Sequence, residues 1–89
     1  MPELLTFGNA LEHLKMGGLV ARNGWNGKNM FLFLVRGEAI TKVINDAYNH
    51  PDAETKDVLD AIYMKTADGK LVPWLASQTD VLSEDWVML

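Results

Sequence analysis

Two tryptophans, each beside small polar residues, are the side chains of this sequence best suited to binding a ligand. Trp25 lies between the turn dipeptides Asn23-Gly24 and Asn26-Gly27, and Trp74 closes a Val-Pro-Trp run. An indole offers a flat face for stacking a base or sugar ring, and neighbouring positive and neutral side chains can hold phosphates and hydroxyls. These features suit a small polar ligand with a ring and an anionic part. The candidate set is Arg22, Trp25, Asn26, Lys28, Trp74, Ser77, Gln78 and Thr79.

Structural roles compete with ligand binding at the same positions. Tryptophan is also a common core or interface residue, and a run such as Ser77-Gln78-Thr79 often caps a helix or forms a turn. His13 is expected on a helix and His50, beside Pro51, in an exposed loop. The sequence leaves both alternatives open for the tryptophans and for the polar run.

Catalytic constellations are scarce. The sequence has no cysteine, no phosphate-binding glycine loop, no dinucleotide fingerprint and no paired-histidine motif. Two isolated histidines make a metal site improbable on ligand number alone. Asp80 and Asp85 could form an acid–base pair, although a helix cap and a turn residue explain them more simply. We therefore expect a binding protein without cofactor or metal rather than an enzyme.

Length, composition and charge narrow the class further. The 89 residues fit one domain, 1–89, with a thin core, and 48% hydrophobic residues are enough to cover a subunit interface as well, which favours a homo-oligomer. A net charge of −4 argues against DNA or RNA, whose binding depends on basic side chains. The longest apolar run, Met30 to Val35, is too short to span a bilayer, so we expect a soluble, cytosolic protein.

The first half of the chain must position the segment around Trp25. Thr6 can cap an amphipathic helix whose apolar residues follow helical spacing until Gly17-Gly18 ends it. Residues 19–22 form a short strand candidate before the turns. Met30 to Val35 is predicted to be the central strand, covered on both faces either by the helix and a partner subunit or by two sheets. A second short helix is expected from Ile40 to Tyr48.

The second half must position Trp74. Residues 61–66 and 71–74 are predicted to form a hairpin around Asp68-Gly69, with Pro73 at a sheet edge because proline lacks a backbone donor. Residues 80–84 are predicted to form one helical turn, capped by Thr79 or Asp80, before a last strand at 86–89. The expected fold is therefore α+β, an antiparallel β-sheet with an N-terminal amphipathic helix and a second short helix. No prediction is made for residues 52–60.

Two long motifs closely resemble the second Thoeris anti-defence family, small phage and prophage proteins long carried as a domain of unknown function. The resemblance covers nearly the whole chain apart from residues 40–60, which are more helical here and poorer in proline and glycine. The motifs are Ala21-Arg22-Asn23-Gly24-Trp25-Asn26-Gly27-Lys28 with the following apolar run, and Met64-Lys65-Thr66-Ala67-Asp68-Gly69 continuing through Val72-Pro73-Trp74-Leu75-Ala76-Ser77-Gln78-Thr79-Asp80 to Glu84-Asp85-Trp86.

The resemblance implies a sponge that acts in the cytoplasm of the infected bacterial host. Members of the family bind the messenger of Thoeris immunity, a cyclic nucleotide of the glycocyclic ADP-ribose type, and keep it from its effector without cleaving it. The resemblance also implies a homotetramer with pockets between subunits. It suggests ring stacking for Trp25 and Trp74, phosphate contacts for Arg22 and Lys28, and hydrogen bonds for the remaining candidates, Asn26, Ser77, Gln78 and Thr79. A small cyclic-nucleotide phosphodiesterase and a module that binds a host defence protein are the alternatives.

Overall fold

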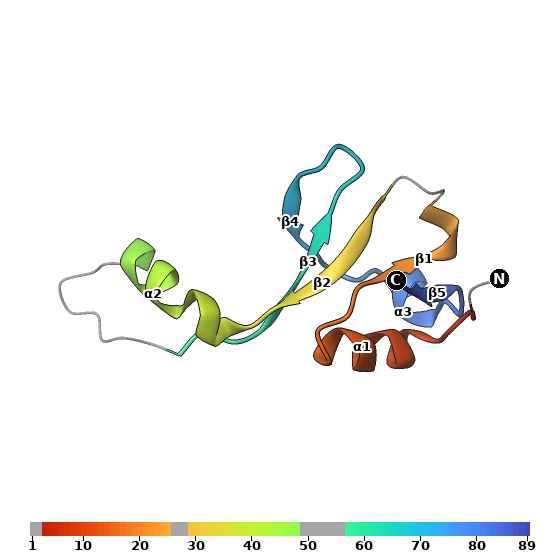
Figure 1. Cartoon of the computed structure of the whole chain (residues 1–89), viewed down its shortest axis with the longest axis horizontal. Helices are drawn as coiled ribbons and strands as arrows, with labels where there is room; N and C mark the ends of the chain where they lie inside the picture. Colours follow the sequence, from red (N-terminus) through yellow and green to blue (C-terminus); the bar gives the residue numbers. More distant parts are fainter. Residues whose placement is uncertain (1–2, 26–28, 49–56) are drawn as a thin grey trace.

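The computed structural model, which describes residues 3–25, 29–48 and 57–89, is an α+β structure (Figure 1). Its described residues form three α-helices, one 3-10 turn and a five-stranded antiparallel sheet with strand order β4-β3-β2-β1-β5. The predicted fold class is confirmed, including the N-terminal helix and the helix in the middle of the chain.

Helix α1 (Phe7–Lys15) begins and ends where the sequence predicts. The Thr6 side chain accepts a hydrogen bond from the backbone N–H of Asn9 at 3.2 Å, as an N-cap residue does. The helix buries Ala10 and Leu14 against the sheet. Gly17 follows with φ of +89°, a conformation that costs glycine little because it has no Cβ. These local signals define where α1 begins and ends in the chain.

The strands also match the predicted segments. Strand β2 (Phe31–Val35) lies at the centre of the sheet, as predicted, between β3 (Ala61–Lys65) and β1 (Val20–Arg22). Strands β3 and β4 (Leu71–Pro73) form the predicted hairpin, with Gly69 at φ of +86° in the turn. Pro73 lies in an edge strand, as expected for a residue without a backbone donor. Strand β5 (Trp86–Met88) forms the other edge.

Helix α3 (Gln78–Leu82) corrects one prediction. Its N-cap is Ser77, and not Thr79 or Asp80 as the sequence analysis expected. The Ser77 hydroxyl accepts from the Asp80 backbone N–H at 3.0 Å, and the Asp80 carboxylate accepts from the Ser77 backbone N–H at 3.0 Å. In this reciprocal capping box, two backbone N–H groups at the start of the helix find side-chain acceptors. The helix therefore begins after Ser77, earlier than predicted.

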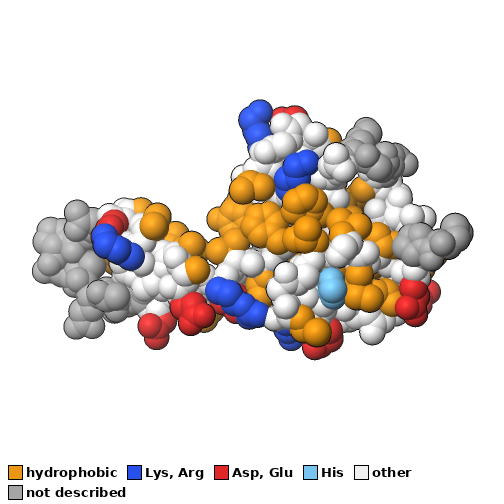
Figure 2. Space-filling model, in the orientation of Figure 1, with side chains coloured by type: hydrophobic (Ala, Val, Ile, Leu, Met, Phe, Trp, Pro, Cys, Tyr) orange, Lys and Arg blue, Asp and Glu red, His pale blue; other side chains and the backbone are white. Residues whose placement is uncertain are grey.

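The central strand has two different faces. Leu32 is buried with Val20 and the apolar side of α1, whereas Phe31 and Phe33 alternate with it and project to the opposite face. Phe33 packs there against Tyr63, with ring centroids 6.2 Å apart. In the part of the chain that is described, all five strands belong to one sheet, so the two-sheet alternative is wrong. Figure 2 shows hydrophobic side chains gathered at the surface over the middle of the molecule.

Helix α2 (Gly37–Tyr48) extends away from the rest of the molecule (Figure 1). With this helix included, the molecule measures 53 × 26 × 22 Å. The predicted helix exists and begins at Gly37, before the expected Ile40. The Gly37 N–H donates to the Asp60 carboxylate at 2.8 Å, and a Cβ at Gly37 would lie 1.6 Å from the Val58 carbonyl oxygen. This close approach requires glycine at the base of the helix. Residues 52–56 of the unpredicted stretch lie outside the described residues.

Candidate functional site

Trp86 brings the two candidate tryptophans together. Its side chain is fully buried, and its ring lies 5.8 Å from that of Trp25 and 6.0 Å from that of Trp74, both nearly perpendicular to it. An edge-to-face contact covers at most one face of an indole, so Trp25 and Trp74 each keep a face that Trp86 does not cover. Trp25 and Trp74 therefore both pack against the same third indole within one chain.

Helix ends and strand pairing hold Trp86 in place. The indole Nε1 donates to the Asp80 backbone carbonyl at 3.0 Å, and Phe7 at the start of α1 packs against the ring at 5.3 Å between centroids. The Trp86 backbone pairs with Leu5 on one side and Arg22 on the other. Trp86 was not among the residues predicted to contact a ligand. Its place in a short strand next to two tryptophan-bearing segments is a tertiary feature that spacing alone does not reveal.

Arg22 projects from β1 into a pair of carboxylates. Its Nε donates to Asp85 at 3.0 Å, and a terminal nitrogen donates to Asp80 at 3.0 Å. The side chain is only 21% exposed. The hydrogen bond to Asp85 raises the pKa of Arg22, against the effect of burial, and Asp80 adds to the rise. Asp80 and Asp85 thus hold a guanidinium rather than each other, and neither acts as the N-cap of a helix. We call these three residues the arginine clamp.

Asp80 joins the arginine clamp to the capping box of α3. Partial burial would raise the pKa of the Asp80 carboxyl, but the Ser77 backbone N–H, the Ser77 hydroxyl and Arg22 together hold it below the usual value. The Ser77 hydroxyl lies 2.9 Å from the carboxylate. The Asp80 carboxylate is therefore ionised at neutral pH and accepts hydrogen bonds from Arg22 and Ser77, as expected of a residue that stabilises the fold.

The remaining predicted site residues are less constrained. Gln78 and Thr79 lie exposed in the first turn of α3, next to the Ser77 cap. Asn26 and Lys28 lie outside the described residues. The structure thus brings Arg22, Trp25, Trp74 and Ser77 to one end of the sheet through Trp86 and Asp80, and whether any of the eight predicted residues contacts a ligand stays a prediction.

A hollow of about 220 Å³ opens beside Trp25. Two of its lining residues, Asn23 and Asn29, were not predicted to belong to the site, although Asn23 lies in the first motif and Asn29 directly follows Lys28. Pockets for drug-sized ligands usually measure about 300–1,000 Å³, so the described residues enclose less volume here than a nucleotide-sized ligand needs. The lining residues are Ala21, Arg22, Asn23, Trp25, Asn29, Met30, Val87 and Leu89.

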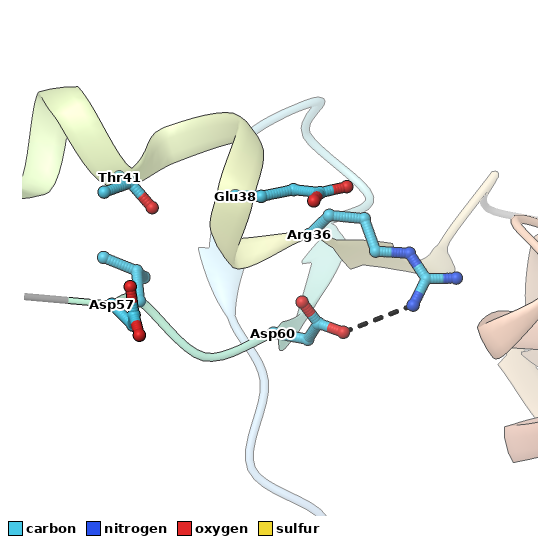
Figure 3. A pocket seen from close by; sticks show the side chains of 6 residues that line it. Arg36, Glu38, Thr41, Asp57 and Asp60 are labelled. Carbon is cyan, nitrogen blue, oxygen red and sulfur yellow. Dashed lines mark hydrogen bonds and ion pairs between the residues drawn. The ribbon is translucent and has the colours of Figure 1, made fainter.

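A larger hollow, of about 450 Å³, lies at the base of α2 (Figure 3). Three carboxylates, those of Glu38, Asp57 and Asp60, line it together with one arginine. That arginine, Arg36, is paired with Asp60 at 3.2 Å. The negative charge disfavours an anionic ligand here, so size does not make this hollow the better candidate.

Within residues 3–25, 29–48 and 57–89, no group of three or more His, Asp or Glu side chains is arranged to hold a metal ion. None of the helices found in the same residues is long and apolar enough to cross a membrane.

The sequence of this chain is similar to those of known proteins. The model of the Thoeris anti-defense 2-like domain matches residues 5–89. The chain belongs to the Thoeris anti-defense 2-like family. A relative from Bacillus phage SP01, named "Thoeris anti-defense 2", is 46% identical over 87 residues, which cover 97% of this chain and 96% of the relative. The resemblance stated from the two motifs is confirmed. The arginine clamp and the aromatic cluster, which consists of Phe7, Trp25, Trp74 and Trp86, are features of a member of this family.

Proposed function

We propose that this protein sequesters, without cleaving it, the cyclic ADP-ribose-type messenger of Thoeris immunity, and that it does so in the cytoplasm of the infected bacterial host. The observation that carries the proposal is the pairing of Trp25 and Trp74 on Trp86 in a chain of the Thoeris anti-defense 2-like family. Trp74 also packs against Phe7, but both indoles are only partly buried, so each has exposed ring surface on which the base or a sugar ring of a nucleotide can stack.

The proposed ligand contacts divide by chemistry. Trp25 and Trp74 stack, Lys28 meets a phosphate, and Asn26, Gln78 and Thr79 donate to or accept from ribose hydroxyls or base edges. Ser77 and Arg22 were assigned similar contacts from the sequence, but both are engaged within the chain, Ser77 with Asp80 and Arg22 with the two carboxylates. Their contribution to binding then depends on what these internal bonds hold in place.

The pairing of Asp80 and Asp85 with Arg22 supports sequestration rather than catalysis. A sponge needs slow release, and it gains nothing from groups that stabilise a transition state. Asp80 and Asp85 are paired with Arg22 rather than free to transfer protons. To deplete a scarce messenger, the dissociation constant should be on the order of nanomolar, or roughly −12 kcal/mol. These points favour binding over the alternative of a small cyclic-nucleotide phosphodiesterase.

A homo-oligomer, which we propose to be a tetramer with pockets between subunits, accounts for two further features. The sheet face that carries Phe31, Phe33 and Tyr63 has no helix over it in the described part of the chain. The hollow beside Trp25 is smaller than a nucleotide requires, so a second subunit would complete it. Burial of the messenger between subunits would also strengthen its charged contacts by excluding water.

Titration calorimetry with a purified cyclic ADP-ribose-type messenger tests the proposal. We expect saturable binding with a dissociation constant on the order of nanomolar. A Met16→Ala variant, altered at an exposed apolar residue at the end of α1, is the matched control and should bind like the wild type. Absence of binding to any cyclic nucleotide messenger would instead favour a module that binds a host defence protein.

A further inference from the structure

Arg22 connects parts of the chain that are distant in sequence. Asp80 lies 58 residues and Asp85 lies 63 residues further along the chain, and both accept from the same guanidinium. A second terminal nitrogen lies 3.4 Å from the other oxygen of Asp85. A planar guanidinium with donors on two edges can bridge two carboxylates in a fixed geometry, whereas an ammonium cannot. The arginine clamp therefore ties β1 to α3 and to the residue that precedes β5.

The backbone carbonyl of each aspartate in the clamp accepts a hydrogen bond from a segment that positions a tryptophan. Asp85 accepts at its backbone carbonyl from the Asn23 N–H at 2.8 Å, which fixes the first residue of the turn η1 (Asn23–Trp25) that carries Trp25. Asp80 accepts at its backbone carbonyl from the Trp86 indole, on which Trp25 and Trp74 both pack. Asp85 thus holds the turn of Trp25, Asp80 holds Trp86, and Trp74 packs on Trp86. Both aspartates bind the same guanidinium.

The charges of the clamp do not favour an anionic ligand at Arg22. Two carboxylates face one guanidinium, so the group carries a net negative charge. A phosphate that approached Arg22 would have to displace a carboxylate that is already hydrogen-bonded, and would leave that carboxylate partly buried without its partner. Such an exchange costs more than it gains unless the displaced carboxylate finds another donor.

We infer that Arg22 is a positioning residue for the messenger site, which sets the geometry of Trp25 and Trp74 through Asp85 and Asp80 and does not bind the phosphate itself. The inference rests on the proposed function for the identity of the ligand. It replaces the phosphate contact that the sequence suggested for Arg22 with a structural cause of affinity, and it adds Asp80 and Asp85 to the residues on which binding depends.

The variants Arg22→Gln, Asp85→Asn and their combination separate the two roles. Calorimetry with the cyclic ADP-ribose-type messenger should show each single variant weakened by about tenfold or more and the double variant no weaker than either single one, because all three break the same contact. If Arg22 bound phosphate, Asp85→Asn would release the guanidinium and preserve or raise the affinity, while Arg22→Gln alone would lose it. That pattern would overturn the inference.

Arg22→Lys is the conservative test, because a lysine keeps the positive charge and can pair with one of the two carboxylates. A lysine still offers a charge to phosphate but cannot bridge both carboxylates. We expect this variant to bind about as weakly as Arg22→Gln. Wild-type affinity in Arg22→Lys would contradict the positioning role.

Near-ultraviolet circular dichroism of the ligand-free proteins gives a readout that does not depend on the messenger. The coupled indoles should lose part of their signal in Arg22→Gln, Arg22→Lys and Asp85→Asn, while Lys70→Gln, altered at an exposed ion pair in the β3–β4 turn, should keep the wild-type spectrum. Unchanged spectra in all the clamp variants would overturn the inference. If the wild type binds no messenger, the proposed function fails, and the spectra still decide whether Arg22 positions the indoles.

Discussion

The two ends of this molecule bury their apolar side chains in different ways. At the sheet end, Trp86 is 0% exposed and contacts Phe7, Trp25 and Trp74. At the other end, the arm formed by α2 and residues 57–60 leaves Val43 67% and Tyr48 60% exposed, although its helix is amphipathic. Among the described residues, the sheet end buries large apolar side chains, whereas the arm leaves them exposed.

This difference indicates which end of the molecule can hold a preformed ligand site. An amphipathic helix whose apolar face is left exposed by the described residues is typical of a surface used for association. The aromatic cluster, by comparison, is fixed by backbone pairing, a capping box and an arginine with two carboxylates. Ligand selectivity is then expected from the sheet end and assembly from the arm and the open sheet face.

The largest expected effect is on stability at the sheet end. Trp86→Ala should lower the free energy of unfolding by about 3–5 kcal/mol, because it removes a fully buried indole and its contacts with three other rings. Urea unfolding followed by far-ultraviolet circular dichroism, at a dilution where the chain is monomeric, measures the change. Trp86→Phe keeps an aromatic ring and provides a milder step if the alanine variant does not fold.

The matched control for this prediction lies in the arm. Tyr48→Ala also removes a large aromatic side chain, but one that is mostly exposed, so unfolding of the monomer should change by less than about 0.5 kcal/mol. Equal losses in Trp86→Ala and Tyr48→Ala would contradict the contrast between the two ends.

The next effect concerns ligand binding. Trp25→Ala and Trp74→Ala should each weaken messenger binding by about 1–3 kcal/mol through lost stacking, as measured by calorimetry. Both residues also pack against the core, so some loss of stability is expected in parallel. If the affinity stayed the same while sedimentation showed smaller assemblies, the tryptophans would belong to a subunit interface instead.

The stability of the two ends should also depend differently on acid pH. The folded-state pKa of Asp80 lies below its ordinary value, so its contribution to stability is present above the usual carboxyl range and is lost as the pH falls through the lowered pKa. Asp80→Asn should cost about 1–2 kcal/mol at neutral pH, and less in acid, where the wild type has itself lost the charge. Urea titrations at neutral and acid pH measure both values.

Asp60 in the arm provides the comparison for acid. A hydrogen bond from the Gly37 N–H, and then Arg36, also lower the pKa of Asp60, but its side chain is 47% exposed and is screened by solvent. Asp60→Asn should therefore change the acid dependence less than Asp80→Asn. The opposite ranking would show that the arm, and not the clamp, controls acid sensitivity.

The smallest effect on chain stability, and the sharpest on assembly, is expected from a charge on the arm. Val43→Glu should change unfolding of the monomer by less than about 0.5 kcal/mol, since the side chain is mostly exposed, while lowering the mass of the assembly in sedimentation. Lys42→Gln alters the net charge equally on the polar side of the same helix and should leave the mass unchanged. An intact assembly in Val43→Glu would exclude the arm from the interface.

The predictions made from sequence succeeded where the signals are local. Thr6, Gly69 and Pro73 each act through their own backbone geometry or hydrogen bonding, and the elements they mark lie where expected. The cap of α3 was wrong because Ser77, Thr79 and Asp80 are all good capping residues within four positions. Only the reciprocal bond between Ser77 and Asp80 decides among them.

Tertiary pairing could not be predicted in the same way. The family resemblance suggested a phosphate contact for Arg22, and the sequence pattern suggested a helix cap and a turn residue for Asp80 and Asp85. Nothing in the spacing of these residues indicates that β1 and β5 are neighbours. The part played by Trp86 depends on the same pairing, since it connects Trp25 with Trp74. The residue types of the candidate site were thus identifiable from the motifs, whereas their mutual arrangement depends on the topology of the sheet.

Recovery of the messenger after binding tests the central claim most directly. The cyclic ADP-ribose-type messenger is incubated with an excess of the protein, the mixture is heat-denatured, and the released ligand is measured by chromatography and by its ability to activate a Thoeris effector. The account predicts that all of the bound messenger returns intact and active. Loss of the messenger, with appearance of a linear product, would contradict sequestration and identify the protein as a phosphodiesterase.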